Sequence, residues 1–271
     1  MRLAIANVTR EDVERWRQAL ARRPAEEFAL TDEHDRLCDA LVAPGGERTT
    51  PCRGRHVVML LPVATQARFW KRYDAFTALG VSVDVLSFER SHYENKGREG
   101  SWTSLGTLEH GRYLARIPVL LRAVPRVLRK AKAGDVLYCY GLDDLVLGWI
   151  VSLVRLKRCP LVLETADIRS AMLGSGMRSR VLRALERFLV KRTKLVVCTS
   201  EYYVSEYYRG RLHATHARYL VLENKPDPAR LPPRGAARRE REDGTLVIGY
   251  FGLLRCQESW DFLMRLAREG A

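Results

Sequence analysis

Short apolar runs alternate with longer amphipathic segments from His56 onward. The runs are rich in Val and Leu and almost continuously apolar, which is typical of strands buried on both faces. They lie at 56–62, 81–88, 135–140, 160–164, 194–199 and 219–223. The helical stretches between them lie at 67–79, 111–132, 143–157, 178–191 and 200–208. This alternation predicts an α/β protein with a Rossmann-like, doubly wound parallel sheet.

The pattern also predicts domain boundaries. Residues 1–54 read as an N-terminal appendage and linker of low order, with one helix capped by Thr9 and running through Trp16. Residues 55–230 form the Rossmann-like domain, and the stretch 231–244, rich in proline, glycine and charge, is a linker. Residues 245–271 supply only one strand and one helix of a second Rossmann-like domain. Because such a unit cannot close a core alone, we expect this second domain to be incomplete.

The chain is strongly basic, with a formal net charge of +14. This charge predicts attraction to polyanions but does not choose among lipid head groups, nucleotide phosphates and nucleic acid. The six cysteines show no C-x-x-C spacing, so we expect buried free thiols in a reducing compartment. No apolar run approaches the length of a spanning helix, and the first apolar stretch is too short for a signal peptide. These features predict a cytoplasmic protein, soluble or peripheral at the inner face of the membrane.

Polar residues cluster in the loops that directly follow the predicted strands, where open α/β sheets bind their ligands. Carboxylates and amides suit sugar hydroxyls, and arginines suit phosphate oxygens. The residues are Thr65, Arg68, Asp143, Asp144, Glu164, Thr165, Asp167, Arg169, Ser200, Glu201, Asn224 and Arg255. We interpret Asp143 and Asp144 as caps of the helix that follows them. No metal-ligand spacing and no nucleic-acid-binding motif is present, so we expect no metal and no nucleic acid partner.

A strand-to-helix turn at 249–255 is the strongest single motif. Gly252 would let a phosphate approach backbone N–H groups at the helix start, and Arg255 would neutralise it. An ordinary tight turn with a solvated arginine explains the same residues equally well.

Six segments, taken in order, resemble the glycosyltransferase family 4-like enzymes of the two-Rossmann-domain (GT-B) type. They are 62–88, 134–145, 160–169, 185–203, 221–227 and 248–255. The segment 160–169, PLVLETADIR, is similar to the family's "P-V-I-Y-D-A-H-D-I" strand, and 248–255, IGYFGLLR, is similar to "I-G-F-V-G-x-L-R". The chain departs from the family at Ala166, where the family has histidine.

The resemblance implies transfer of a sugar from a nucleotide-diphosphate donor to a cell-envelope or exopolysaccharide acceptor, without a metal or cofactor. Residues 55–230 would be the acceptor-side domain and 245–271 the start of the donor-side domain. The resemblance places Thr65, Arg68, Asp167, Ser200, Glu201 and Asn224 on the acceptor side of the cleft, with Asp167 as the catalytic candidate. Gly252 and Arg255 would hold the donor phosphates. We do not expect this chain to catalyse by itself.

The helix around 114–132 suggests a second partner. We expect Leu114, Ile117, Leu120, Leu121, Val124, Val127 and Leu128 on one arc, and Arg116, Arg122, Arg126, Arg129 and Lys130 opposite. This pattern suits an anionic membrane surface, and it also suits an ordinary surface helix packed on the sheet. The alternative function is therefore a non-catalytic module that docks on a membrane or on a full-length transferase.

Overall fold

The computed structural model describes residues 33–42, 54–90, 101–109, 113–223 and 225, with isolated helical residues at 11, 15, 18, 260, 261, 264, 265 and 268. The chain divides into two compact units, Met1–Arg230 and Leu231–Ala271. The sheet and the helices that cover it belong to the first unit. The predicted helix through Trp16, the strand at 245–250 and the turn at 249–255 lie outside the described residues.

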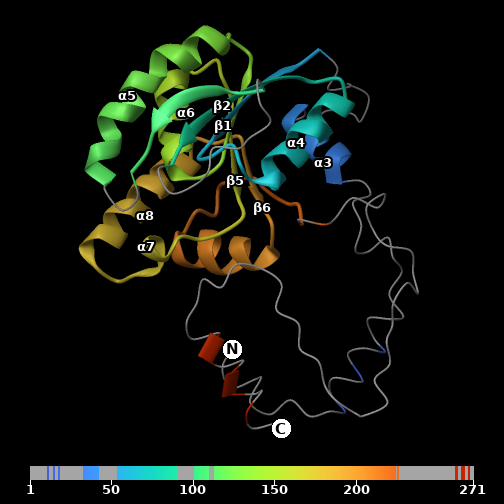
Figure 1. Ribbon diagram of the computed structural model, residues 1–271, viewed down its shortest axis with the longest axis vertical. Helices are drawn as coiled ribbons and strands as arrows, with labels where there is room; N and C mark the ends of the chain where they lie inside the picture. Colours follow the sequence, from blue (N-terminus) through green and yellow to red (C-terminus); the bar gives the residue numbers. More distant parts are fainter. Residues whose placement is uncertain are drawn as a thin grey trace. The chain divides into compact units, whose positions relative to one another are not determined.

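The first unit is built on a seven-stranded, wholly parallel sheet in the order β3-β2-β1-β4-β5-β6-β7 (Figure 1). The strands are β1 (His56–Leu61), β2 (Ser82–Glu89), β3 (Thr103–Thr107), β4 (Val136–Cys139), β5 (Leu161–Thr165), β6 (Leu195–Cys198) and β7 (Tyr219–Val221). The strand order reverses between β1 and β4, which defines a Rossmann-like, doubly wound sheet. The predicted fold class is confirmed.

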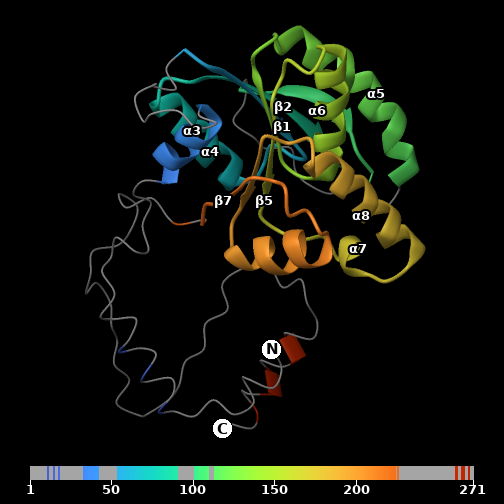
Figure 2. The same ribbon diagram turned by 180° about the vertical axis from the view of Figure 1, so that it is seen from behind.

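Helices cover both faces of the sheet (Figures 1 and 2). One layer consists of α3 (Glu33–Val42) and α4 (Ala67–Ala78). The other consists of α5 (Tyr113–Lys130), α6 (Leu142–Val154), the short α7 (Ser170–Leu173), α8 (Met177–Val190) and a π-helix, η2 (Tyr203–Arg211). Two buried clusters match these layers, because alternate β1 residues face opposite ways: Val58 packs with the α5–α8 layer and Met59 with the α3–α4 layer.

Two elements differ from the sequence-based expectation. Strand β3 was not predicted. Only Leu105 of its residues 103–107 is buried, so this edge strand has no long apolar run to indicate it. Helix α3 lies within the stretch 1–54 that we expected to be an appendage of low order. Its Leu37 and Leu41 are buried in the core beside α4, so this part of the stretch belongs to the packed domain.

The stripe of helix α5 that faces the sheet only partly matches the predicted apolar arc. Arg116 and Leu120 are buried, and the buried stripe continues through Ala123 and Val127. Ile117 and Leu121, which we expected on the same arc as Leu120 and Val127, are 51% and 55% exposed. The predicted arc is therefore divided between two sides of the helix. Arg116, which we expected on the opposite side, lies in the buried stripe with Leu120 and Val127, and a second apolar stripe faces outward. Among the described residues, no helix is both long and apolar enough to cross a membrane.

Candidate functional site at the carboxyl edge of the sheet

The carboxyl ends of the strands form the edge where the chain leaves β1 and β4 toward opposite faces. From β1 it enters α4 on one face, and from β4 it enters α6 on the other. This divergence opens a crevice in doubly wound sheets, and ligands bind there. Two groups of charged side chains lie around this edge.

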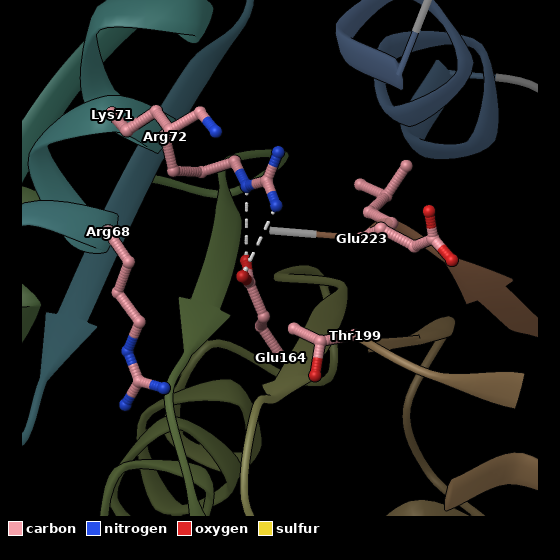
Figure 3. A pocket seen from close by; sticks show the side chains of 7 residues that line it. Arg68, Lys71, Arg72, Glu164, Thr199 and Glu223 are labelled. Atoms are coloured by element: carbon pink, nitrogen blue, oxygen red, sulfur yellow. Dashed lines mark hydrogen bonds and ion pairs between the residues drawn. The ribbon is translucent and has the colours of Figure 1, made fainter. Parts of the chain in front are cut away.

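The first group lines a pocket next to α4 (Figure 3). Its walls are Arg68, Lys71, Arg72, Glu164, Thr199, Leu222 and Glu223. The three cations occupy positions i, i+3 and i+4 of α4, so they share one helix face. Glu164 is the next-to-last residue of β5 and Thr199 follows β6, while Leu222 and Glu223 follow β7. The pocket therefore collects side chains from one helix and three strand ends.

The floor of the pocket is a buried ion pair. Arg72 Nε and Nη2 donate to Glu164 Oε2 and Oε1, each at 3.2 Å, and the Tyr138 hydroxyl donates to Oε2 at 2.5 Å. Burial alone would lower the pKa of the Arg72 guanidinium, but the Glu164 carboxylate offsets this effect and the pKa is raised. Arg72 therefore stays charged and fixed in place.

The two other cations of α4 stand beside this pair. Arg68 is half-buried, its guanidinium carbon lies 4.8 Å from the centre of the Phe69 ring, and its Nε has no hydrogen-bond partner among the described residues. Lys71 donates to the backbone carbonyl of Lys225. With the Arg72 charge neutralised by Glu164, Arg68 and Lys71 supply the pocket's positive charge.

The second group surrounds Asp143 at the start of α6. Its Oδ2 accepts from Arg116 Nη1 at 2.8 Å and Arg169 Nη1 at 3.2 Å, and Arg90 Nη2 lies 3.8 Å away. The three arginines come from α5 and from the loops after β5 and β2. Burial, and then the neighbouring Arg169 and Arg116, lower the pKa of the Arg90 guanidinium. Three guanidinium groups around one carboxylate leave an excess of positive charge, which attracts a further anion.

Asp144 lies beneath this group and is fully buried. Neither of its carboxylate oxygens has a hydrogen-bond partner in the described part of the chain. Burial, and then the nearby Asp143, raise the pKa of Asp144 well above its ordinary value. The capping interpretation of this acidic pair is wrong: Gly141 is the N-cap residue of α6, and no side chain caps it. Asp143 binds arginines instead.

The predicted site residues are only partly brought together. Arg68 lines the pocket, whereas Thr65, Asp167, Ser200 and Glu201 do not. Thr65 and Ser200 are half-buried, Asp167 and Glu201 are exposed, and Ser200 Oγ accepts the Tyr202 N–H at 3.2 Å. Asn224, Gly252 and Arg255 lie outside the described residues. Among the residues that are described, no group of three or more His, Cys, Asp or Glu could hold a metal ion.

Sequence reasoning missed several of the residues that the fold brings to this edge. They are Lys71, Arg72, Arg90, Arg116 and Tyr138. One signal was present, because three cations at helical spacing directly after the first strand mark a basic helix face at the carboxyl edge.

The geometry defines a Rossmann-like domain with a cationic pocket at its carboxyl edge. No family's sequence model matches the chain. The chain is 31% identical over 215 residues to the succinoglycan biosynthesis protein ExoL of Rhizobium meliloti (strain 1021). This match covers 73% of the chain and 51% of that protein, so the chain spans about half the length of its curated relative. Sucrose-phosphate synthase from Thermosynechococcus elongatus superposes with a TM-score of 0.45 at 13% identity, covering 62% of this chain and 48% of that one.

Proposed function

We propose that this chain carries the acceptor-side domain of a glycosyltransferase, one that moves a sugar from a nucleotide-diphosphate donor to a cell-envelope or exopolysaccharide acceptor. The pocket at Arg68 and Lys71 is the observation that carries the proposal. The relative's role in succinoglycan biosynthesis supports the same class of reaction. So does the resemblance of six segments to family 4-like enzymes.

The cationic side chains of the pocket suit the phosphate group of a substrate. Arg68 and Lys71 would bind phosphate oxygens through charge-assisted hydrogen bonds, while Thr199 and Glu223 would bind sugar hydroxyls. Because Arg72 is already paired with Glu164, its role is to fix the pocket floor rather than to bind the anion. In the proposal, Arg68 and Lys71 stabilise the charge that develops on a departing diphosphate.

Asp167 remains our catalytic candidate, and we propose that it acts as a general base. It is exposed in the loop after β5, so its carboxylate could approach an acceptor hydroxyl at the crevice and accept its proton. Its neighbour Ala166 cannot share this task, because alanine has no titratable group. The donor contacts at Gly252 and Arg255 complete the proposal.

Calorimetric titration with inorganic pyrophosphate tests the pocket directly. We expect Arg68→Gln/Lys71→Gln to weaken pyrophosphate binding at least about tenfold, since each charge-assisted hydrogen bond contributes roughly 1.5–3 kcal/mol. The matched control is Arg129→Gln/Lys132→Gln, which removes the same charge from exposed positions outside the pocket. Equal affinity in the two double variants would show that net charge, not this pocket, attracts the anion.

Transfer is measured on the product of the whole reading frame, with a panel of labelled nucleotide sugars and a lipid extract as the acceptor source. Asp167→Asn is expected to abolish transfer and leave pyrophosphate binding unchanged. Pyrophosphate binding at the pocket without transfer from any nucleotide sugar would favour the non-catalytic docking module.

A further inference from the structure

Exposed apolar side chains are concentrated on one helix layer. Of the twelve large hydrophobic residues that are exposed in the described part of the chain, ten lie between residues 117 and 188. They belong to α5, to α6 and the turn after it, to α7 and to α8. No described residue of α3 or α4 is an exposed large hydrophobic. Isolated exposed apolar residues are ordinary, but a concentration of this kind marks an interaction surface.

The spacing of these residues shows that they form stripes. On α8, Met177, Val181, Leu185 and Phe188 follow one another at helical spacing, and the first two are 73% and 59% exposed. The opposite side of α8 is buried through Leu189 and Val190. Helix α8 therefore has two apolar sides, of which the sheet uses only one.

The stripes of neighbouring helices join into one surface. Helix α6 lies between α5 and α8 and contacts both (Figures 1 and 2). Its Trp149 ring packs edge-on against Phe188 of α8, with ring centres 5.4 Å apart. On α5 the exposed Ile117 and Leu121 lead to the half-buried Val124 and Leu128. We name the outward side of α5, α6 and α8 the docking face.

The charged residues of the docking face are of one sign. Arg122, Arg126 and Arg129 of α5 are exposed, whereas the exposed Lys130 is paired with Asp84 of β2 at 3.1 Å. On α8, Arg178, Arg180 and Arg187 are exposed as well. All three acidic residues of these helices, Asp143, Asp144 and Glu186, are buried. The docking face therefore presents apolar and cationic groups with no exposed carboxylate among its described residues.

We propose that the docking face binds an anionic lipid surface, with its apolar stripes inserted among the acyl chains and its arginines among the head groups. Charge complementarity selects this occupant. Two copies of the chain meeting through this face would bring cations against cations, which opposes association. A bilayer rich in anionic lipid accepts both groups, because basic residues gain from its surface potential and apolar ones from burial. The proposal does not depend on sugar transfer.

Co-sedimentation with vesicles tests the proposal on the full chain. We expect at least about tenfold stronger binding to phosphatidylcholine vesicles that contain about a third phosphatidylglycerol than to pure phosphatidylcholine, because each basic residue near an anionic surface strengthens binding about fivefold. Leu121→Asp/Val181→Asp should abolish binding. Arg122→Gln/Arg180→Gln/Arg187→Gln should reduce it at least about tenfold. All five positions are exposed, so the fold should survive, and circular dichroism checks this.

The matched controls lie outside the docking face. Tyr202→Asp changes an exposed aromatic residue, and Arg36→Gln/Arg211→Gln removes exposed charge from α3 and η2; both should bind vesicles like the parent chain. Equal binding to neutral and anionic vesicles would overturn the proposal. The proposal would also be overturned if sedimentation velocity showed a dimer of the parent chain and Val181→Asp dissociated that dimer. The docking face would then bind a second copy of the chain.

Discussion

The two helix layers of this domain use their apolar residues differently. In the α3–α4 layer the large apolar side chains point inward: Phe69, Trp70 and Phe76 of α4 pack against the sheet, and the outward side carries polar groups such as Asp74. In the α5–α8 layer the inward side packs apolar residues on the sheet and also buries charged residues such as Arg116 and Glu186, and the outward side is apolar and basic. One layer is complete once it covers the sheet, whereas the other presents a second apolar side that the fold does not use.

A similar contrast holds for the buried glutamates of the two layers. Glu164, facing α4, is paired with the Arg72 guanidinium. Glu186 of α8 has no cation at ion-pair distance among the described residues, and its carboxylate accepts from Tyr207 at 2.5 Å and lies 3.5 Å from the Tyr208 hydroxyl. The site of Glu164 needs a charged carboxylate, whereas the site of Glu186 favours a neutral carboxyl group. Stability should therefore respond differently to changes at each.

The largest effect is expected from breaking the ion pair under α4. Glu164→Gln keeps an acceptor for Tyr138 but leaves the buried Arg72 charge without a carboxylate, and we expect a loss of about 3–5 kcal/mol in the free energy of unfolding. Urea unfolding measures it. Arg72→Met/Glu164→Gln is the control, because it removes the stranded charge and should recover most of the loss. If Glu164→Gln alone were as stable as the parent, the ion pair would not contribute to the stability of this layer.

The pH dependence of stability should distinguish the other glutamate. Burial raises the pKa of Glu186 from 4.5 to about 7. The folded state thus holds this proton more tightly than the unfolded state. The stabilisation that the protonated Glu186 gives to the folded state is therefore full below about pH 4.5 and is lost as pH rises through 7. Between pH 4.5 and 8, the parent should lose about 3 kcal/mol relative to Glu186→Gln. Parallel stability curves for the two proteins would contradict a buried neutral carboxyl.

The inner side of α6 offers a smaller test. A Cβ added at Gly148 would lie 2.8 Å from Cys139 Sγ and 3.3 Å from Leu161 Cδ2, so Gly148→Ala should cost about 1–3 kcal/mol of stability. Cys139→Ala removes the closest atom. The double variant should therefore be more stable than the sum of the two single changes predicts, and chemical unfolding of all four proteins measures this coupling.

The sequence predicted the central strands because they are buried on both faces and read as unbroken apolar runs. It missed β3, whose position at the edge of the sheet leaves only Leu105 buried. For α5, periodicity could not decide which stripe meets the sheet, because the stripes starting at Arg116 and at Ile117 are both largely apolar. Tertiary contacts chose the first, since Arg116 reaches Asp143 at the start of α6.

For the candidate site, the sequence indicated the correct edge of the sheet but only some of its residues. Arg68 lies at the start of α4 and Glu164 near the carboxyl end of β5, so the rule that parallel sheets bind ligands at this edge found them. Arg72 lies further along α4, and its partner Glu164 is 92 residues away in the sequence. The observed pairing requires the three-dimensional arrangement, which local patterns do not contain.

The smallest stability effect is expected on the outward side of the α5–α8 layer, and it decides whether that side serves the fold at all. Val181 is 59% exposed, so Val181→Asp should change the free energy of unfolding by no more than about 0.5 kcal/mol. Leu189→Ala, which truncates a fully buried side chain on the inward side of the same helix, should cost about 2–5 kcal/mol. Urea unfolding of both variants gives the comparison. If Val181→Asp were as damaging as Leu189→Ala, the outward stripe would be part of the folded core and unavailable to a lipid surface.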